Sequence, residues 1–191
     1  DEGNSNYGTA IVGTVSGTSI SFGSPTVYQS ANASETAIAY DSNAQRIIVA
    51  YTNGGDGDHG YAAVGTVSGT GFSGFGTPVE FRNADLRYNS IVFDSNANKV
   101  VVIWREDDDS NKGKFVIGTV ATSGNTVTFD ATTLTTFESS NGVAWTSSVF
   151  DSSNNKVLIA WHLYPIGKSA ILQVGFTNEK LTAENFIGTS A

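Results

Sequence analysis

The stretch IVFDSNANKVVVIWR, residues 91–105, places a polar turn between two apolar runs. Runs of β-branched and aromatic residues on either side of an Asp-Ser-Asn cluster are typical of two short strands joined by a tight turn. Related stretches occur at residues 39–52, AYDSNAQRIIVAYT, and at residues 149–162, VFDSSNNKVLIAWH. In each copy an aromatic residue precedes the Asp and another lies near the end of the second strand. Three copies of one hairpin predict a repeat protein.

A second marker fixes the period of the repeat. The tripeptide GTV begins at Gly13, Gly65 and Gly118, while the turn aspartates are Asp41, Asp94 and Asp151. Both markers recur at intervals of 52–57 residues, and a decayed GTV-like copy follows at residues 174–176. Periods near 50 residues are typical of propellers, solenoids and arrays.

The second unit is expected to contain four strands, at residues 88–93, 99–105, 114–120 and 126–137. Four consecutive antiparallel strands in about 50 residues match one blade of a β-propeller. The predicted fold is therefore all-β, a propeller of four-stranded antiparallel blades of about 53 residues. An open array of stacked β-meanders is the alternative. Only residues 179–186 offer a short helical pattern.

The whole chain, residues 1–191, is predicted to be a single repeat domain. It divides into a half blade at 1–29, blades at 30–82 and 83–138, and a blade with an atypical C-terminal end at 139–191. About three and a half blades are fewer than the four to eight that close a propeller ring. Because open ends expose strand edges, we expect the ring to be completed by missing sequence or by a second copy of the chain. The absence of an initiator Met indicates a processed chain or a fragment.

The composition opposes several classes of function. The chain has no cysteine, which excludes disulfides and thiolate metal sites. Its 18 acidic and 10 basic residues give a net charge of −8, which opposes binding to nucleic acid and to anionic membranes. No apolar run approaches the roughly 18 residues of a transmembrane helix. We therefore expect neither nucleic-acid binding nor membrane insertion.

The two ends of the predicted blades differ in how well the units agree. The turns between the first and second strands are nearly identical, and their Asp residues are expected to accept backbone N–H bonds. The loops at the other end vary, and we call this end the variable face. They read TNGGDGDHG (52–60), REDDDSNKG (105–113), HLYPIGKS (162–169), SANASE (30–35), RNADLR (82–87) and ESSNG (138–142). Loops that vary over a constant scaffold are where binding residues usually lie.

The candidate ligand-binding residues all belong to this variable face. They are His59, Arg82, Arg87, Trp104, Arg105, Asp107 and Trp161. Arginines can bind a carboxylate, as in sialidase-like propellers, and tryptophans can stack on a sugar ring. The alternatives are local ion pairs for the arginines and packing between blades for the tryptophans.

Closely spaced carboxylates in the same loops are candidate metal ligands. Asp56, Asp58, Asp107 and Asp109 could hold Ca²⁺, which takes six to eight oxygen ligands, or could form a solvated acidic loop. His59 and His162 are the two histidines of the chain, and by themselves they are a weak indication of a zinc site. No G-x-S-x-G elbow or comparable motif is present, so no catalytic residue is assigned.

Several segments resemble one family of repeats. They are YGTAIVGTVSGTSISFGSP (7–25), YDSNAQRIIVAY (40–51) and GFTNEKLTAENFIGTSA (175–191). They are similar to repeats found in marine phage and viral tail-fibre proteins and in related bacterial surface proteins. The resemblance covers nearly the whole chain, and it is looser in the third unit, where HLYPIGKS replaces the acidic loop. It implies propeller-like blades in a virion or cell-surface adhesin, with no catalytic residues to carry over.

These observations predict a non-enzymatic binding or adhesion module of a viral fibre or cell-surface protein that recognises a glycan or surface polymer. The expected location is the virion, or the extracellular or cell surface. The expected partners are other blades or a second copy of the chain, together with the glycan. One alternative is a purely structural spacer or filament subunit, and another is a glycosidase-type propeller.

Overall fold

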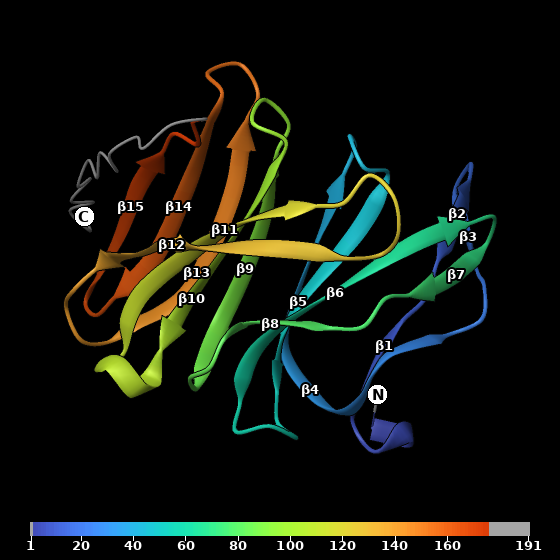
Figure 1. The fold of residues 1–191 in the computed structure, drawn as a ribbon, viewed down its shortest axis with the longest axis horizontal. Coiled ribbons are helices and arrows are strands. Elements are labelled where there is room, and N and C mark those ends of the chain that lie inside the picture. The colour runs from blue at the N-terminus through green and yellow to red at the C-terminus, as the bar shows by residue number, and fades with distance from the viewer. Residues whose placement is uncertain (1, 176–191) are drawn as a thin grey trace.

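The computed structural model describes residues 2–175, which form an all-β protein of several antiparallel sheets (Figure 1). The strands are β1 (Tyr7–Ala10), β2 (Gly13–Ser16), β3 (Ser19–Phe22), β4 (Thr26–Asp41), β5 (Arg46–Asn53), β6 (His59–Ser68), β7 (Gly71–Phe75), β8 (Val79–Arg82), β9 (Leu86–Asp94), β10 (Lys99–Glu106), β11 (Lys112–Val120), β12 (Val127–Glu138), β13 (Val143–Asp151), β14 (Lys156–Leu163) and β15 (Ile166–Leu172). Two short 3₁₀ turns, η1 (Glu2–Asn4) and η2 (Asp107–Asp109), complete the elements. Among the described residues, no helix has the length and apolar character needed to span a bilayer.

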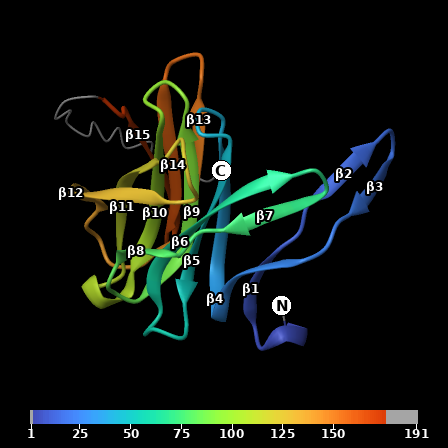
Figure 2. The same ribbon diagram turned by 45° about the vertical axis from the view of Figure 1, so that its right-hand side comes forward.

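The strands form three main sheets and one separate hairpin. The first sheet has the order β1-β4-β5-β6-β7, with β8 also paired to β6. The second has the order β12-β11-β10-β9, and the third has the order β13-β14-β15. Strands β2 and β3 pair only with each other and project from the rest (Figure 2). Thus β4 to β8, β9 to β12 and β13 to β15 are three successive meanders.

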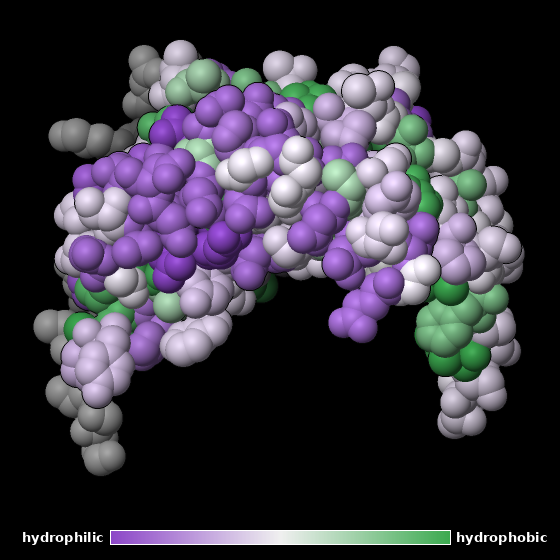
Figure 3. Space-filling view, turned by 90° about the horizontal axis from the view of Figure 1, so that it is seen from below, coloured by the Kyte–Doolittle hydropathy of each residue, from purple (hydrophilic) through white to green (hydrophobic). Residues whose placement is uncertain are grey.

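The first strands of the three meanders lie together. Strand β9 contacts both β4 and β13, so these three strands line up across the molecule (Figure 1). Seen from below, the protein is an arch that is hollowed on one side (Figure 3). No closed barrel or ring is formed by the described residues.

The four strands expected in the second unit agree with β9 to β12, whereas one expected loop is wrong. Residues 30–35 are not a loop, because β4 runs without a break from Thr26 to Asp41. Its first half pairs with β1, where Asn32 lies opposite Tyr7, and its second half pairs with β5, where Ala33 lies opposite Asn53. The backbone finds a partner strand on both sides of the expected break, so no loop is needed. The expected helical pattern at 179–186, and most of the C-terminal segment 175–191, lie outside the described residues.

The repeated turns form as predicted. The Asp41 Oδ1 accepts the backbone N–H groups of Asn43 and Ala44, at 2.9 and 2.8 Å. Asp94 accepts those of the residues two and three positions later at 2.9 and 3.0 Å, and Asp151 does the same at 2.9 and 3.2 Å. These are Asx-turns, so the shared Asp has a structural role in all three units.

The core lies between the sheets, because the central strands are apolar on both faces. Along β10, Val100, Val102 and Trp104 pack toward the first sheet, while Val101 and Ile103 pack toward the third. All five side chains are fully buried. A strand covered on both faces has a continuous apolar sequence, which accounts for the run VVVIW.

An aromatic pair recurs in each meander, between its second strand and a ring from earlier in the chain. The pairs are Tyr51 with Tyr28, Trp104 with Phe81, and Trp161 with Phe137, with ring centroids 5.3, 5.4 and 4.9 Å apart. The second ring of each pair lies over a glycine, at Gly8, Gly60 and Gly113 respectively. A Cβ at any of these glycines would come within 2.4–2.6 Å of the ring. The equivalent glycine of the third sheet, Gly167, has no heavy atom within 4 Å of such a Cβ.

Candidate functional site

The variable face lies at the end of the sheets opposite the repeated Asp turns. In Figure 1 those turns are at the top, and the loop that contains η2 is at the bottom. Figure 3 views this lower end and shows hydrophilic residues gathered over much of it. The structure therefore separates the constant and variable loops as the meander predicts.

A β-bulge occurs at the same place in the first strand of each meander. The bulged residues are Glu35, Tyr88 and Trp145, with φ of 49°, 57° and 47°, and the strand register shifts at each. A bulky residue in the left-handed region is unusual and costs of order 1–3 kcal/mol. Bulges redirect side chains and are common beside functional sites. Here they turn two aromatic side chains toward the variable face.

The bulges are tied to one another across the three strands. The backbone N–H of Tyr88 donates to Glu35 Oε2 at 2.7 Å, and the Thr146 hydroxyl donates to the Tyr88 carbonyl oxygen. Nearer to the Asp turns, Ser90 and Ser148 share a hydrogen bond of 2.7 Å between their hydroxyls. These bonds hold the bulged residues of neighbouring sheets in a fixed relation.

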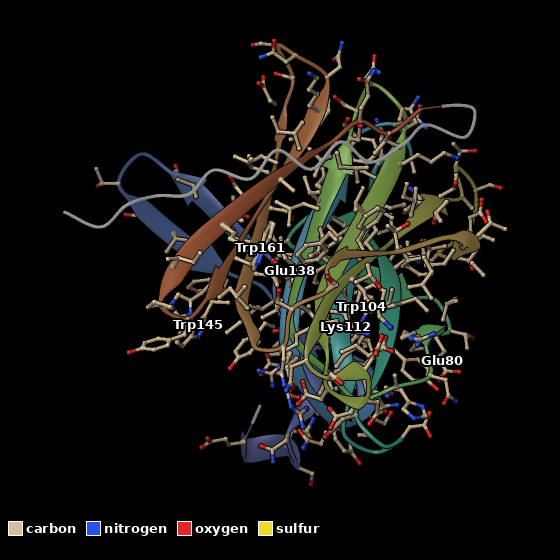
Figure 4. The ribbon with its side chains drawn as sticks, turned by 90° about the vertical axis from the view of Figure 1, so that its left-hand side faces the viewer. Glu80, Trp104, Lys112, Glu138, Trp145 and Trp161 are labelled. Atoms are coloured by element: carbon tan, nitrogen blue, oxygen red, sulfur yellow. The ribbon has the colours of Figure 1, made fainter. Side chains whose placement is uncertain are left out.

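A row of rings crosses the junction between the second and third sheets, and we call it the aromatic row. It consists of Tyr88, Trp145, His162 and Tyr164, whose successive centroids are 6.1, 5.1 and 6.2 Å apart. Trp145 is 67% exposed and Tyr164 is 87% exposed. Figure 4 shows Trp145 at the free end of its strands, away from the buried Trp104 and Trp161. The exposed rings of Trp145 and Tyr164, with the half-buried rings beside them, offer an apolar surface on which a flat ligand can stack.

Arg105 closes one end of the aromatic row. Its guanidinium carbon lies 4.7 Å from the centroid of the Tyr88 ring. The same guanidinium donates to Asp107, from Nε to Oδ1 at 2.5 Å and from Nη2 to Oδ2 at 3.0 Å. Arg105 and Asp107, both predicted as ligand-binding residues, therefore lie beside the row and place polar groups at its edge.

Arg82 has a different partner, inside the protein. Its Nε and Nη2 donate to the two carboxylate oxygens of Glu106 at 2.7 and 2.5 Å. Lys114 Nζ also donates to Glu106 Oε1 at 2.8 Å. Burial raises the pKa of Glu106, but the hydrogen bonds from Arg82 and Lys114 outweigh it and hold the pKa below its usual value. This buried network stabilises the loop that contains η2 and occupies the guanidinium of Arg82.

Arg87 is paired with two carboxylates that neither Arg82 nor Arg105 contacts. Its Nη2 donates to Asp58 Oδ2 at 2.9 Å, and its Nη1 lies 3.3 Å from Asp85 Oδ1. The three predicted arginines, Arg82, Arg87 and Arg105, thus bind three separate sets of carboxylates. They do not converge on one point as a carboxylate-binding arginine cluster would require.

The four carboxylates predicted as Ca²⁺ ligands are also divided. Asp58 pairs with Arg87, Asp107 with Arg105, and Asp109 with Lys112 and Lys114. Only Asp56 joins a group of donors in the described residues, and its companions there are His59 and Glu80. The predicted calcium set is therefore not assembled in the described residues, since three of its members are paired with basic side chains.

Trp104 and Trp161 do not reach the surface. Trp104 is fully buried, Trp161 is 4% exposed, and each packs on a phenylalanine of the preceding sheet. As ligand-stacking residues they are wrong, and the alternative of packing between sheets is the structural outcome. The exposed rings of Trp145 and Tyr164, with the half-buried ring of Tyr88 beside them, were not expected from the sequence. Tyr88 and Trp145 occupy one position of the repeat, and that shared aromatic position was the available signal.

No family model matches this chain, and no curated protein sequence matches it either.

Proposed function

We propose that this protein is a non-enzymatic carbohydrate-binding module that holds a glycan against the aromatic row. The observation that carries the proposal is the exposure of Trp145 and Tyr164 in a row with Tyr88 and His162. The C–H face of a sugar ring is apolar and flat enough to stack on such rings. The Arg105–Asp107 pair at the edge offers donors and acceptors for sugar hydroxyls.

Other ligand classes fit this surface less well. A nucleic acid also stacks on aromatic rings, but a net charge of −8 repels its phosphates. A catalytic role would require a nucleophile or an acid–base pair aimed at a bound substrate. The charged groups at the edge of the row, Arg105 and Asp107, are instead paired with each other. A neutral polysaccharide or glycan is the ligand that best suits exposed rings in a hydrophilic surround.

A glycan array followed by calorimetry tests this function. We expect wild-type protein to bind at least one glycan, and Trp145→Ala and Tyr164→Ala each to weaken that binding more than tenfold. Tyr40→Ala is the matched control, because Tyr40 is an exposed ring (54%) next to the Asp41 turn, at the opposite end of the sheets. Absence of wild-type binding to every glycan tested, or equal losses in Tyr40→Ala and Trp145→Ala, would refute the proposal.

We further propose that the three meanders are propeller blades whose open faces accept further blades. Equivalent positions are buried inside the arch and exposed at its ends. Ile38 of the first meander is 62% exposed, whereas its equivalent Ile91 is 7% exposed. Leu158 of the third is 39% exposed, whereas its equivalent Val101 is fully buried. These contacts inside the chain support another unit of the same kind as the cover of each end.

A second copy of the chain is the partner that we propose for these faces. The two open faces are the two different halves of one repeated interface, so copies can associate head to tail and close a ring. Sedimentation of the 191-residue chain is then expected to give a multiple of the 20.0 kDa monomer. Leu158→Glu together with Ile38→Glu should return it to monomer, and a wild-type monomer at high concentration would contradict the proposal.

The setting that we propose is a virion fibre or a cell surface. It rests on the resemblance to tail-fibre and bacterial surface repeats and on the proposed carbohydrate ligand. A structural spacer is the second candidate, and it is favoured by the repeated, wholly buried contacts between sheets. The glycan experiment separates the binding module from the spacer, because a spacer is not expected to bind a glycan through the exposed ring of Trp145.

A further inference from the structure

A second group of side chains, apart from the aromatic row, lies on the first sheet. His59 Nδ1 is 3.0 Å from Glu80 Oε1 and 3.6 Å from Asp56 Oδ2. The three donor atoms all lie within 4.8 Å of one another. In Figure 4, Glu80 is on the opposite side of the view from Trp145, so this group does not belong to the aromatic row.

Strand pairing and a hydrogen bond fix the positions of these three residues. His59 begins β6, and Glu80 lies on β8, which pairs with β6 through Tyr61. Asp56 belongs to the loop before β6, and its Oδ2 accepts a hydrogen bond of 2.6 Å from the Tyr61 hydroxyl. The side chains of His59, Asp56 and Glu80 are 21%, 50% and 35% exposed, so the group is open to solvent on one side.

The second meander shows what the equivalent position contains. There Asp109 takes the place of Asp56, and it binds the ammonium groups of Lys112 and Lys114 at 2.9 and 2.7 Å. By strand register, His59 replaces Lys112 and Tyr61 replaces Lys114 in the first meander.

The first meander therefore has neither of the two lysines that neutralise this position in the second meander. It also has one more carboxylate, because Glu80 stands where the second meander has Thr136. Within the described part of the chain, the ion pairs of Asp56 and Glu80 involve His59 alone. Two carboxylates this close repel each other unless a cation lies between them.

We propose that Asp56, His59 and Glu80 form a binding site for a divalent transition-metal ion, with Zn²⁺ as the ion of choice. Zinc bonds to imidazole nitrogen and carboxylate oxygen are about 2.0–2.2 Å long. Donors around one tetrahedral zinc are then about 3.3 Å apart, given those bond lengths. The observed separations of 3.0 and 3.6 Å bracket that value.

The donor set distinguishes between metals. An imidazole with two carboxylates suits zinc and its neighbours in the first transition row. Calcium takes six to eight oxygens and magnesium an octahedron of oxygens, which one imidazole and two carboxylates do not offer. Three protein ligands leave a fourth position open on the solvent side. The Tyr61 hydroxyl would continue to orient Asp56 in the metal-bound site.

Calorimetry with zinc chloride tests the site in protein that has first been treated with EDTA and then exchanged into a buffer without a chelator. We expect one Zn²⁺ per chain and more than tenfold weaker binding in both His59→Ala and Glu80→Gln. Asp109→Asn is the matched control, since it alters the equivalent carboxylate of the second meander, and it should bind zinc like wild type. Calcium chloride should give no saturable heat.

A second readout keeps the test independent of folding defects. Zinc should raise the melting temperature of wild-type protein, because a ligand that binds the native state stabilises it. The shift should vanish in Glu80→Gln, whose metal-free melting temperature should match that of wild type. Co²⁺ should give visible absorption bands in wild type that are absent in Glu80→Gln. Zinc affinity that is unchanged by His59→Ala and Glu80→Gln, or no zinc binding by wild type, would overturn the proposal.

Discussion

The contact between Gly113 and Phe137 gives the most quantitative test of how the sheets are held together. A Cβ at residue 113 would lie 2.4 Å from Phe137 Cζ and 2.6 Å from Cε2. Ordinary carbon–carbon contacts are about 3.5–4.0 Å, so the ring would have to move by roughly 1 Å. It has little room, because Phe137 is 8% exposed and packs edge-on against Trp161.

Gly113→Ala should therefore destabilise the protein. Overpacking of a buried site costs about 1–3 kcal/mol. For a chain of this size, each kcal/mol lowers the melting temperature by about 2–4 °C. Urea denaturation followed by Trp fluorescence measures the free energy of unfolding directly.

Gly167→Ala, at the equivalent position of the third sheet, is expected not to destabilise the protein. No heavy atom lies within 4 Å of the added Cβ there. The substitution then acts chiefly on the unfolded chain and should be neutral or stabilise by about 0.4–1 kcal/mol. A Gly113→Ala, Phe137→Leu double variant should recover part of the loss. Equal effects of the two Gly→Ala changes would refute the packing argument.

Three further predictions concern buried carboxylates and turns. Glu106→Ala leaves Arg82 without its buried partner and should cost about 3 kcal/mol in urea denaturation, since breaking a buried ion pair costs about 3–5 kcal/mol; a loss under 1 kcal/mol would contradict the network. Hydrogen bonds from basic side chains hold the pKa values of Glu106 and Glu138 below the usual 4.5 despite burial. The ionised carboxylates therefore stabilise the folded protein fully above pH 4.5, and this stabilisation is lost as the pH falls through the lowered pKa values. Acid denaturation of wild type should accordingly begin below that pH, and an identical acid limb in Glu106→Gln would argue against this. Asp94→Ala, at a buried turn, should destabilise by about 1–3 kcal/mol through unsatisfied N–H groups, whereas the exposed Asp151→Ala should cost clearly less.

Much of the fold follows from local, repeated patterns. The turn at Asp94 is predictable because Asp, Ser and Asn favour one local geometry. The aromatic that recurs at the position of Trp104 indicated packing between units, which was the alternative to ligand stacking. Both features depend on neighbours within a few residues or on the next unit along the chain.

The bulges and the aromatic row depend on geometry that the sequence does not mark. Tyr88 and Trp145 adopt positive φ without the Gly or Asn that normally signals it. The row brings together residues from β9, β13, β14 and the loop after β14, which only the packing of two sheets places side by side. Residues 30–35 likewise carry turn-forming residues, yet the partner strands on both sides make them a strand.

The exposed indole of Trp145 reports directly on whether the aromatic row holds a glycan. Trp104 and Trp161 are buried, so Trp145 is the one tryptophan of the chain that is open to solvent. Acrylamide quenching of tryptophan fluorescence should therefore arise mainly from Trp145 and should be suppressed when a glycan binds. Saturable protection by a glycan identified on the array, absent in Trp145→Phe, is the result that we predict. Glycan binding that leaves the quenching of Trp145 unchanged would contradict a glycan site on the aromatic row.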